Sequence, residues 1–137
     1  MIVLDTSGLL CLLDEGEPEH DRVRRCVEAE RGPLVTVDLV LAETDFLVLK
    51  RLGREGERAF LAQLLHGALL REAVTDGDLE RAATIIEQYA DQDIGLTDAT
   101  LMAVAERLDC LRVLTLDRRH FAPFRDHRGR AIEILPA

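Results

Sequence analysis

The sequence has few cysteines, and nothing in their spacing pairs them. The three lie far apart: Cys11, Cys26 and Cys110. An odd number without any C-x-x-C pair argues against both a disulfide framework and a zinc site. The four histidines also lack the spacing of metal ligands: His20, His66, His120 and His127. Single histidines of this kind are more often surface or core residues than ligands.

Long apolar runs are missing as well. No stretch approaches the roughly 20 residues that span a bilayer, and the start, MIVLD, lacks the basic region and cleavage site of a signal peptide. We therefore expect a cytoplasmic protein without a membrane partner. The 137 residues, 47% hydrophobic and 31% charged, contain no repeat, low-complexity tract or linker. This indicates one globular domain over residues 1–137.

The chain has no basic excess, because its formal net charge is −9. Polyanion binding usually leaves a basic footprint, so this charge argues against a nucleic-acid partner. The distribution weakens that argument, since arginines gather near the C-terminus: Arg118, Arg119, Arg125, Arg128 and Arg130. On charge alone, a solvated arginine-rich tail explains the cluster equally well.

Short apolar runs alternate with helical patterns along the chain. The runs that predict strands are residues 2–4, 34–37, 112–116 and 131–135, with a weaker one at 69–74. Helices are predicted from about 18 to 30, over 38–52 and 55–65 on either side of Gly53, from about 76 to 89, and over 97–108. The expected N-caps are Asp38, Thr75 or Asp76, and Thr97. This alternation favours an α/β fold with an open, mainly parallel sheet and helices on both faces.

Two acids follow predicted strands directly. Asp5 comes after Ile-Val-Leu, and Asp117 comes after Val-Leu-Thr-Leu. The carboxyl ends of parallel strands form the edge at which open α/β sheets bind ligands. The two carboxylates are therefore candidate neighbours at that edge.

Two further acids interrupt apolar helix faces. Glu43 shares its face with Leu39, Phe46 and Leu47, and Asp98 has Leu101, Met102 and Ala105 at helical spacing. Helix faces of this kind normally pack against a sheet, so a carboxylate there needs a partner.

If these four acids converge, their mutual repulsion must be relieved. Two carboxylates about 5 Å apart at an effective dielectric near 20 repel by about 3 kcal/mol, so the six pairs sum to about 20 kcal/mol, more than a domain's usual stability. Such a cluster must take up protons or bind cations. Oxygen ligands without Cys or His favour Mg²⁺ or Mn²⁺ over zinc.

Each acid also has an ordinary explanation. Asp98 can favour a helix N-terminus through the macrodipole, and Asp5 can be a solvated turn residue. Asp117 can pair with Arg118 or Arg119, and Glu43 can be a buried acid paired with an arginine. Only the joint placement of the four acids favours a metal site.

Four segments, in order along the chain, carry a resemblance to a known family. They are MIVLDTSGLL, LVTVDLVLAETDFLV, YADQDIGLTDATLMAVAERL and RVLTLDRRHF. Together they resemble the PIN domain, and within it the VapC ribonuclease toxins of bacterial toxin–antitoxin pairs. The resemblance covers essentially the whole chain and implies a PIN-like α/β/α sandwich.

The resemblance also implies the residues of the site. Asp5 and Asp98 match metal ligands for one or two Mg²⁺ ions, with Mn²⁺ as the other candidate. Glu43 and Asp117 complete the acidic pocket. The supporting positions are two hydroxyls and a further acid: Thr6, Thr115 and Asp91.

The activity that the resemblance implies is endonucleolytic cleavage of RNA, tRNA or rRNA in particular. A metal-bound water with a lowered pKa attacks the phosphodiester, leaving 5′-phosphate and 3′-hydroxyl ends. Four arginines are candidates for holding the RNA backbone: Arg118, Arg119, Arg125 and Arg128. The implied partners are a small antitoxin and a second copy of the chain, with residues 39–52 and 60–65 as candidate interfaces.

Three other functions also fit part of the sequence. A haloacid-dehalogenase-type phosphatase begins with a strand ending in Asp, but it needs a second Asp where Ser7 stands. A receiver domain needs a late lysine, and the only lysine is Lys50. A catalytically inactive PIN-like module that binds RNA or protein is the remaining alternative, and the four acids argue against it.

Overall fold

A fully buried strand, β1 (Ile2–Leu4), lies at the centre of a five-stranded sheet in the computed structural model, which describes residues 1–137. The other strands are β2 (Leu34–Thr36), β3 (Leu70–Arg71), β4 (Arg112–Leu114) and β5 (Glu133–Leu135). Their order is β3-β2-β1-β4-β5, and every pairing is parallel. The expected parallel α/β sheet is therefore confirmed, and β1 and β4 end side by side.

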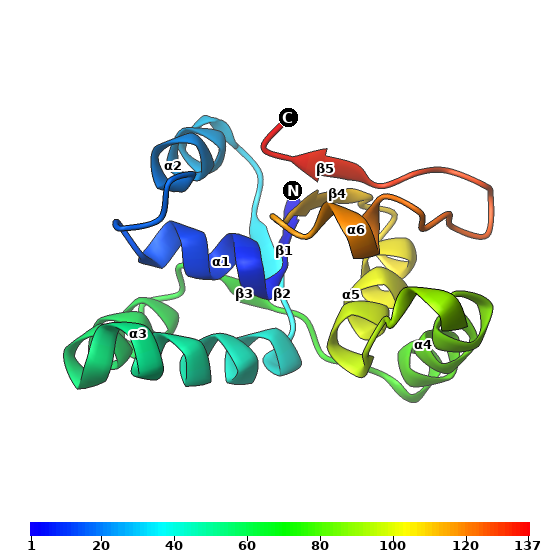
Figure 1. Cartoon of the computed structure of the whole chain (residues 1–137), viewed down its shortest axis with the longest axis horizontal. Helices are drawn as coiled ribbons and strands as arrows, with labels where there is room; N and C mark the ends of the chain where they lie inside the picture. The colour runs from blue at the N-terminus through cyan, green and yellow to red at the C-terminus, as the bar shows by residue number, and fades with distance from the viewer.

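Six helices and one 3₁₀ segment surround the sheet. They are α1 (Thr6–Leu13), α2 (His20–Ala29), α3 (Asp38–Leu65), α4 (Asp76–Gln88), η1 (Ala90–Gln92), α5 (Leu96–Arg107) and α6 (Arg118–Phe121). Figure 1 shows α1, α2 and α3 on one side of the sheet, and α4 and α5 on the other. None of the helices combines the length and the apolar character needed to cross a bilayer.

Several local expectations change in the structure. Residues 38–65 form one helix, α3, but Gly53 has φ 71° and ψ −169°, so the two predicted arms meet at a kink there. Thr75 caps α4 through a reciprocal pair of hydrogen bonds with Asp78. The N-caps expected at Asp38 and Thr97 were wrong, because Val37 and Gly95 precede those helices.

Two helices were not expected from the sequence. The apolar stretch after Asp5 forms α1, and the arginines after Asp117 form the single turn α6. Helix α1 begins just after β1, and α6 begins just after Asp117. Both are too short to show a long periodic pattern, so tertiary contacts hold them in place.

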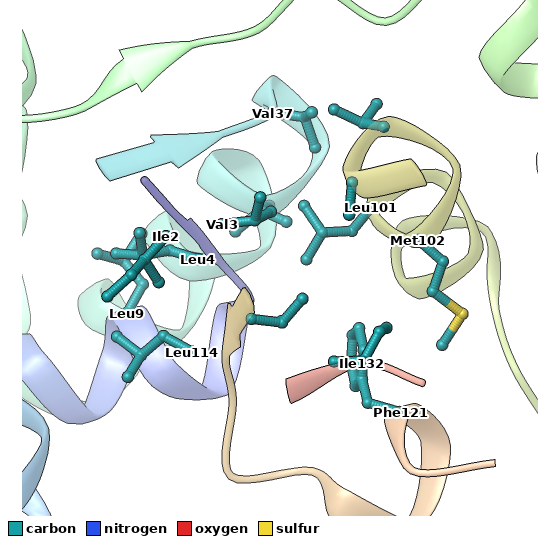
Figure 2. Packing of buried hydrophobic residues seen from close by; sticks show 14 of the residues in the cluster. Ile2, Val3, Leu4, Leu9, Val37, Leu101, Met102, Leu114, Phe121 and Ile132 are labelled. Carbon is teal, nitrogen blue, oxygen red and sulfur yellow. The ribbon is translucent and has the colours of Figure 1, made fainter. Parts of the chain in front are cut away.

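The core forms because alternate residues of β1 face opposite layers. Figure 2 shows Ile2 and Leu4 packed with Leu9 of α1, while Val3 faces Leu101 of α5. Helix α5 is buried all round, with residues 99–105 forming one continuous buried run between the sheet and α4. Its first turn is thereby fixed at the carboxyl edge of the sheet.

Gly8 allows α1 to lie directly against β4. A β-carbon at this position would lie 2.3 Å from the carbonyl oxygen of Leu114, which no side chain can accommodate without moving the backbone. The missing side chain at Gly8 therefore brings Ser7 within reach of the end of β4.

We predict that Gly8→Ala destabilises the fold by about 1–3 kcal/mol or more, because α1 must shift away from β4. Urea unfolding measures the change. Gly77→Ala is the matched control, since a β-carbon there meets only a hydroxyl at 3.7 Å. Equal effects of the two substitutions would contradict this account of α1 packing.

Candidate metal centre

Asp5 lies directly after β1, and the residue is almost completely buried. Its backbone N–H donates to the Leu114 carbonyl at 3.0 Å. Oδ2 accepts hydrogen bonds from Thr115 Oγ1 at 2.7 Å and from Ser7 Oγ at 2.9 Å. Burial raises the pKa of Asp5, and the hydroxyl donors partly offset the rise. The carboxylate is therefore fixed in one orientation.

The same two hydroxyls join the end of β1 to the end of β4. Ser7 Oγ accepts from Leu116 N at 2.9 Å, and Thr115 Oγ1 accepts from Asp117 N at 2.9 Å. Each hydroxyl thus binds the Asp5 carboxylate and the chain that leads to Asp117. This arrangement sets the spacing between Asp5 and Asp117.

Ser7, rather than Thr6 as the sequence suggested, supplies the hydroxyl next to Asp5 that orients its carboxylate. The Thr6 hydroxyl is buried without a hydrogen-bond partner, whereas Ser7 contacts the Asp5 carboxylate. Sequence reasoning used Ser7 only to exclude a phosphatase. Its position in the first turn after a buried strand-end acid was the signal that could have identified it.

Asp98 lies in the first turn of α5, and the charges of three other acids act on its carboxylate. Its pKa is raised to about 7, first by burial and then by the charges of Asp5, Asp117 and Glu43, while His120 opposes the rise. Three of the four acids that the sequence singled out, Asp5, Asp98 and Asp117, therefore lie near one another, while Glu43 acts from farther away.

Asp117 follows β4 and closes the site from the other side. Its Oδ1 accepts from the backbone N–H of His120 at 3.2 Å, which caps α6. Its Oδ2 lies 2.7 Å from His120 Nδ1, and the same nitrogen lies 3.3 Å from Asp98 Oδ2. The expected alternative partners, Arg118 and Arg119, make no ion pair with Asp117.

His120 is the site residue that sequence spacing missed. Ligand atoms of Asp98, Asp117 and His120 all lie within 4.8 Å of one another, a grouping that can hold a metal ion. The residues come from α5, the end of β4 and α6. Because Asp98 lies on a different helix from His120 and is distant from it in sequence, the spacing of residues along the chain could not reveal this cluster.

Glu43 and Asp91 are more peripheral. Glu43 is exposed on α3, and its charge raises the pKa of Asp98 less than the charges of Asp5 and Asp117 do. The helix face that Glu43 shares with Phe46 is less buried than the sequence suggested, since Phe46 is 65% exposed. Asp91 lies exposed in η1.

The four arginines proposed for RNA contact divide into two groups. Arg118 and Arg119 lie on α6, beside Asp117, and both are exposed. Arg125 donates to the carbonyls of Ala122 and Phe124, so its guanidinium binds the backbone of its own turn. Arg128 lines a separate cavity with Arg107, at the opposite end of α5 from Asp98.

The donor set fits a divalent cation. Asp5 and Asp98 have raised pKa values because burial disfavours their charged forms. Asp117 and His120 add an oxygen and a nitrogen atom at close range. A bound cation would stabilise the ionised carboxylates, and carboxylate oxygen is the ligand that Mg²⁺ and Mn²⁺ prefer.

Comparison with known proteins identifies the family. The PIN domain profile matches residues 2–126. The chain belongs to the PIN domain family. Ribonuclease VapC26 of Mycobacterium tuberculosis is 38% identical over 135 residues, covering 98% of this chain and all of that protein. The resemblance to VapC proteins is therefore confirmed.

Solved PIN structures share this fold. The crystal structure of VapC20 of M. tuberculosis, described as a sarcin–ricin loop cleaving toxin, is 26% identical with a TM-score of 0.76, and covers 82% of this chain and 87% of VapC20. The DNA-bound VapBC structure from Salmonella typhimurium has a chain that is 21% identical with a TM-score of 0.67, covering 98% of this PIN domain and 97% of that chain. At that identity the Salmonella structure shows the shared fold alone.

We predict that Asp98→Asn raises thermal stability in EDTA. The folded pKa of about 7 exceeds the ordinary value of 3.8, so the ionised form destabilises the fold increasingly as the pH rises from about 4 to 7. Asparagine cannot ionise, and the variant should unfold several degrees higher than wild type at pH 8, roughly 2–8 °C. The gain should be smaller at pH 5.

The control for this experiment is Asp76→Asn, an exposed acid in the first turn of α4. Its effect on the unfolding temperature should not grow between pH 5 and pH 8. If the unfolding temperatures of both variants, relative to wild type, change equally between pH 5 and pH 8, the ionised Asp98 carboxylate does not oppose folding.

Proposed function

We propose that this PIN protein is a divalent-metal-dependent endoribonuclease and the toxin of a VapBC-type pair. The observation that carries the proposal is the closeness of Asp98 and Asp117, whose ligand oxygens lie within 4.8 Å of each other, with the buried Asp5 near enough for its charge to raise the pKa of Asp98. The identity to Ribonuclease VapC26 supports the activity.

The chain's own residues would prepare the site in distinct ways. Asp98 and Asp117 supply oxygen ligands, and Asp5 adds a third carboxylate whose orientation Ser7 and Thr115 fix. Glu43 adds negative charge from α3. When bound, Mg²⁺ or Mn²⁺ lowers the pKa of water and stabilises charge on a phosphodiester. Hydrolysis of this kind leaves 5′-phosphate and 3′-hydroxyl ends.

Structured RNA is the proposed substrate. The sarcin–ricin loop activity named for VapC20, which shares 26% identity, supports an rRNA loop as the first substrate to test, with tRNA next. Single-stranded loops are favoured because the major groove of A-form RNA is too narrow for side chains to read. Arg118 and Arg119, on the turn beside Asp117, are positioned to contact phosphates near the cut.

A small antitoxin and a second copy of the chain are the proposed partners. The Salmonella relative is a VapBC complex bound to DNA. The second arm of α3 exposes large apolar side chains, with Leu61 at 44% and Leu65 at 88% exposure. Burial of such surface drives protein association, so this arm is the proposed contact surface.

The alternative is a PIN-like module that binds RNA or protein without cutting. This alternative leaves the buried carboxylates without a role, although their mutual repulsion and burial disfavour the fold. The hydroxyls of Ser7 and Thr115 also orient a carboxylate that a binding module does not need. Metal-dependent cleavage explains both features.

We predict that purified protein cleaves structured RNA with Mg²⁺ or Mn²⁺ and not in EDTA. Asp5→Asn and Asp98→Asn should each lower the cleavage rate by about a hundredfold or more, because each removes charge from the metal centre. Asp76→Asn should cleave like wild type. Gel analysis with end-specific ligation reports the rate and the 5′-phosphate.

Two results would contradict the nuclease proposal. Cleavage that persists in EDTA, or that survives both substitutions, excludes the metal mechanism. RNA binding without cleavage across an rRNA and tRNA panel favours the inactive module.

We also predict that Arg118→Ala together with Arg119→Ala raises KM for RNA by about tenfold and leaves kcat within about twofold, because these residues contact phosphates outside the reacting group. The dependence of KM on salt should become less steep. Arg31→Ala, an exposed arginine just before β2, is the control. A fall in kcat with KM unchanged would place the α6 arginines in a different role.

A further inference from the structure

The His120 side chain is turned into the acidic site by its own backbone. Its N–H donates to Asp117 Oδ1 at 3.2 Å, so the α6 turn begins against the strand-end carboxylate. The imidazole then folds back toward the same residue and is only 15% exposed. Its orientation is therefore set by the turn.

The buried ring nitrogen of His120 lacks a hydrogen bond. Nδ1 lies 2.7 Å from Asp117 Oδ2 and 3.3 Å from Asp98 Oδ2. Neither oxygen is aligned with the ring for a hydrogen bond, so the nitrogen has no hydrogen-bond partner. A buried nitrogen this close to two carboxylate oxygens, without a hydrogen bond to either, is available to a cation bound between them.

The spacing suits a common cation. Two donors that each lie about 2.1 Å from one ion are about 3.0 Å apart in cis positions and about 4.2 Å apart in trans. The ligand atoms of Asp98, Asp117 and His120 lie within 4.8 Å of one another. The two nitrogen–oxygen distances from His120, 2.7 Å to Asp117 and 3.3 Å to Asp98, lie near the cis spacing.

We infer that His120 is a direct ligand of the catalytic cation through Nδ1, beside Asp98 and Asp117. This inference rests on the proposed function, since it adds a nitrogen atom to the same metal centre. Mg²⁺ strongly prefers oxygen, whereas imidazole is a good ligand for first-row transition metals. The site therefore selects Mn²⁺ over Mg²⁺ more strongly than an all-carboxylate site would.

The second ring nitrogen must carry the proton in the metal-bound state. Nε2 lies 3.3 Å from an Arg119 guanidinium nitrogen, and a guanidinium can only donate. Arg119 is exposed, so its side chain can leave when a cation takes Nδ1. Nε2–H then donates to water instead.

Manganese binding without RNA tests this inference directly. With one equivalent of Mn²⁺, pulsed electron paramagnetic resonance of wild type should show ¹⁴N coupling from a bound imidazole. His120→Ala should lose this coupling and weaken Mn²⁺ binding by about tenfold or more. Its Mg²⁺ affinity should change by less than about threefold, as measured by calorimetry.

Two further variants separate ligation from folding effects. His127→Gln changes an imidazole that is 58% exposed and lies beside Glu106, away from the site; it should keep the coupling and both affinities. His120→Asp replaces nitrogen by oxygen and should bind Mg²⁺ at least as well as wild type, with a lower ratio of Mn²⁺ to Mg²⁺ affinity.

The outcomes distinguish this inference from the proposed function. If wild type binds Mn²⁺ without ¹⁴N coupling, His120 is not a ligand, and the nuclease proposal stands. If wild type binds neither ion, the metal-dependent function fails as well. Because the coupling is measured on wild type, the test of ligation holds even where a variant fails to fold.

Discussion

The carboxyl ends of β1 and β4 are joined by two hydroxyls, and the site depends on that junction. Ser7 and Thr115 each donate to the Asp5 carboxylate, and each accepts a backbone N–H from the chain after β4. Parallel pairing alone brings the two strand ends to one edge. The hydroxyls then fix where the Asp5 oxygens point and where Asp117 begins. Gly8 permits this contact because it lets α1 approach β4.

Buried acids in this protein fall into two electrostatic classes. At one end of α5, Asp78 binds Arg107 and Glu106 binds Arg81. Those ion pairs hold the pKa values of both carboxyls below their usual range, despite burial. Near the sheet edge, Asp5 and Asp98 have no arginine, and their pKa values are raised. Acids of the first class tie helices together, whereas the charge of those in the second class is relieved only by protonation or by a bound cation.

This division also explains how an acidic protein can act on RNA. Part of the net charge of −9 is concentrated in the site, where bound cations would neutralise it. The arginines of α6 lie beside that site, so positive charge is available where a phosphate would lie. Net charge is therefore a poor guide here, because binding depends on the local field.

The sequence by itself determined the alternation of strands and helices, the four acids and the family. Strand-end positions and helical spacing are local properties, so Asp5, Asp117, Glu43 and Asp98 could be singled out without coordinates. The tertiary structure decided the rest. Ser7 rather than Thr6 binds Asp5, and His120 joins Asp98 and Asp117. Arg128 lines a separate cavity, away from these site acids. Each of these depends on contacts between residues far apart in sequence or on side-chain direction. Periodicity records which face a residue occupies, and it carries no information about which distant residue that face meets.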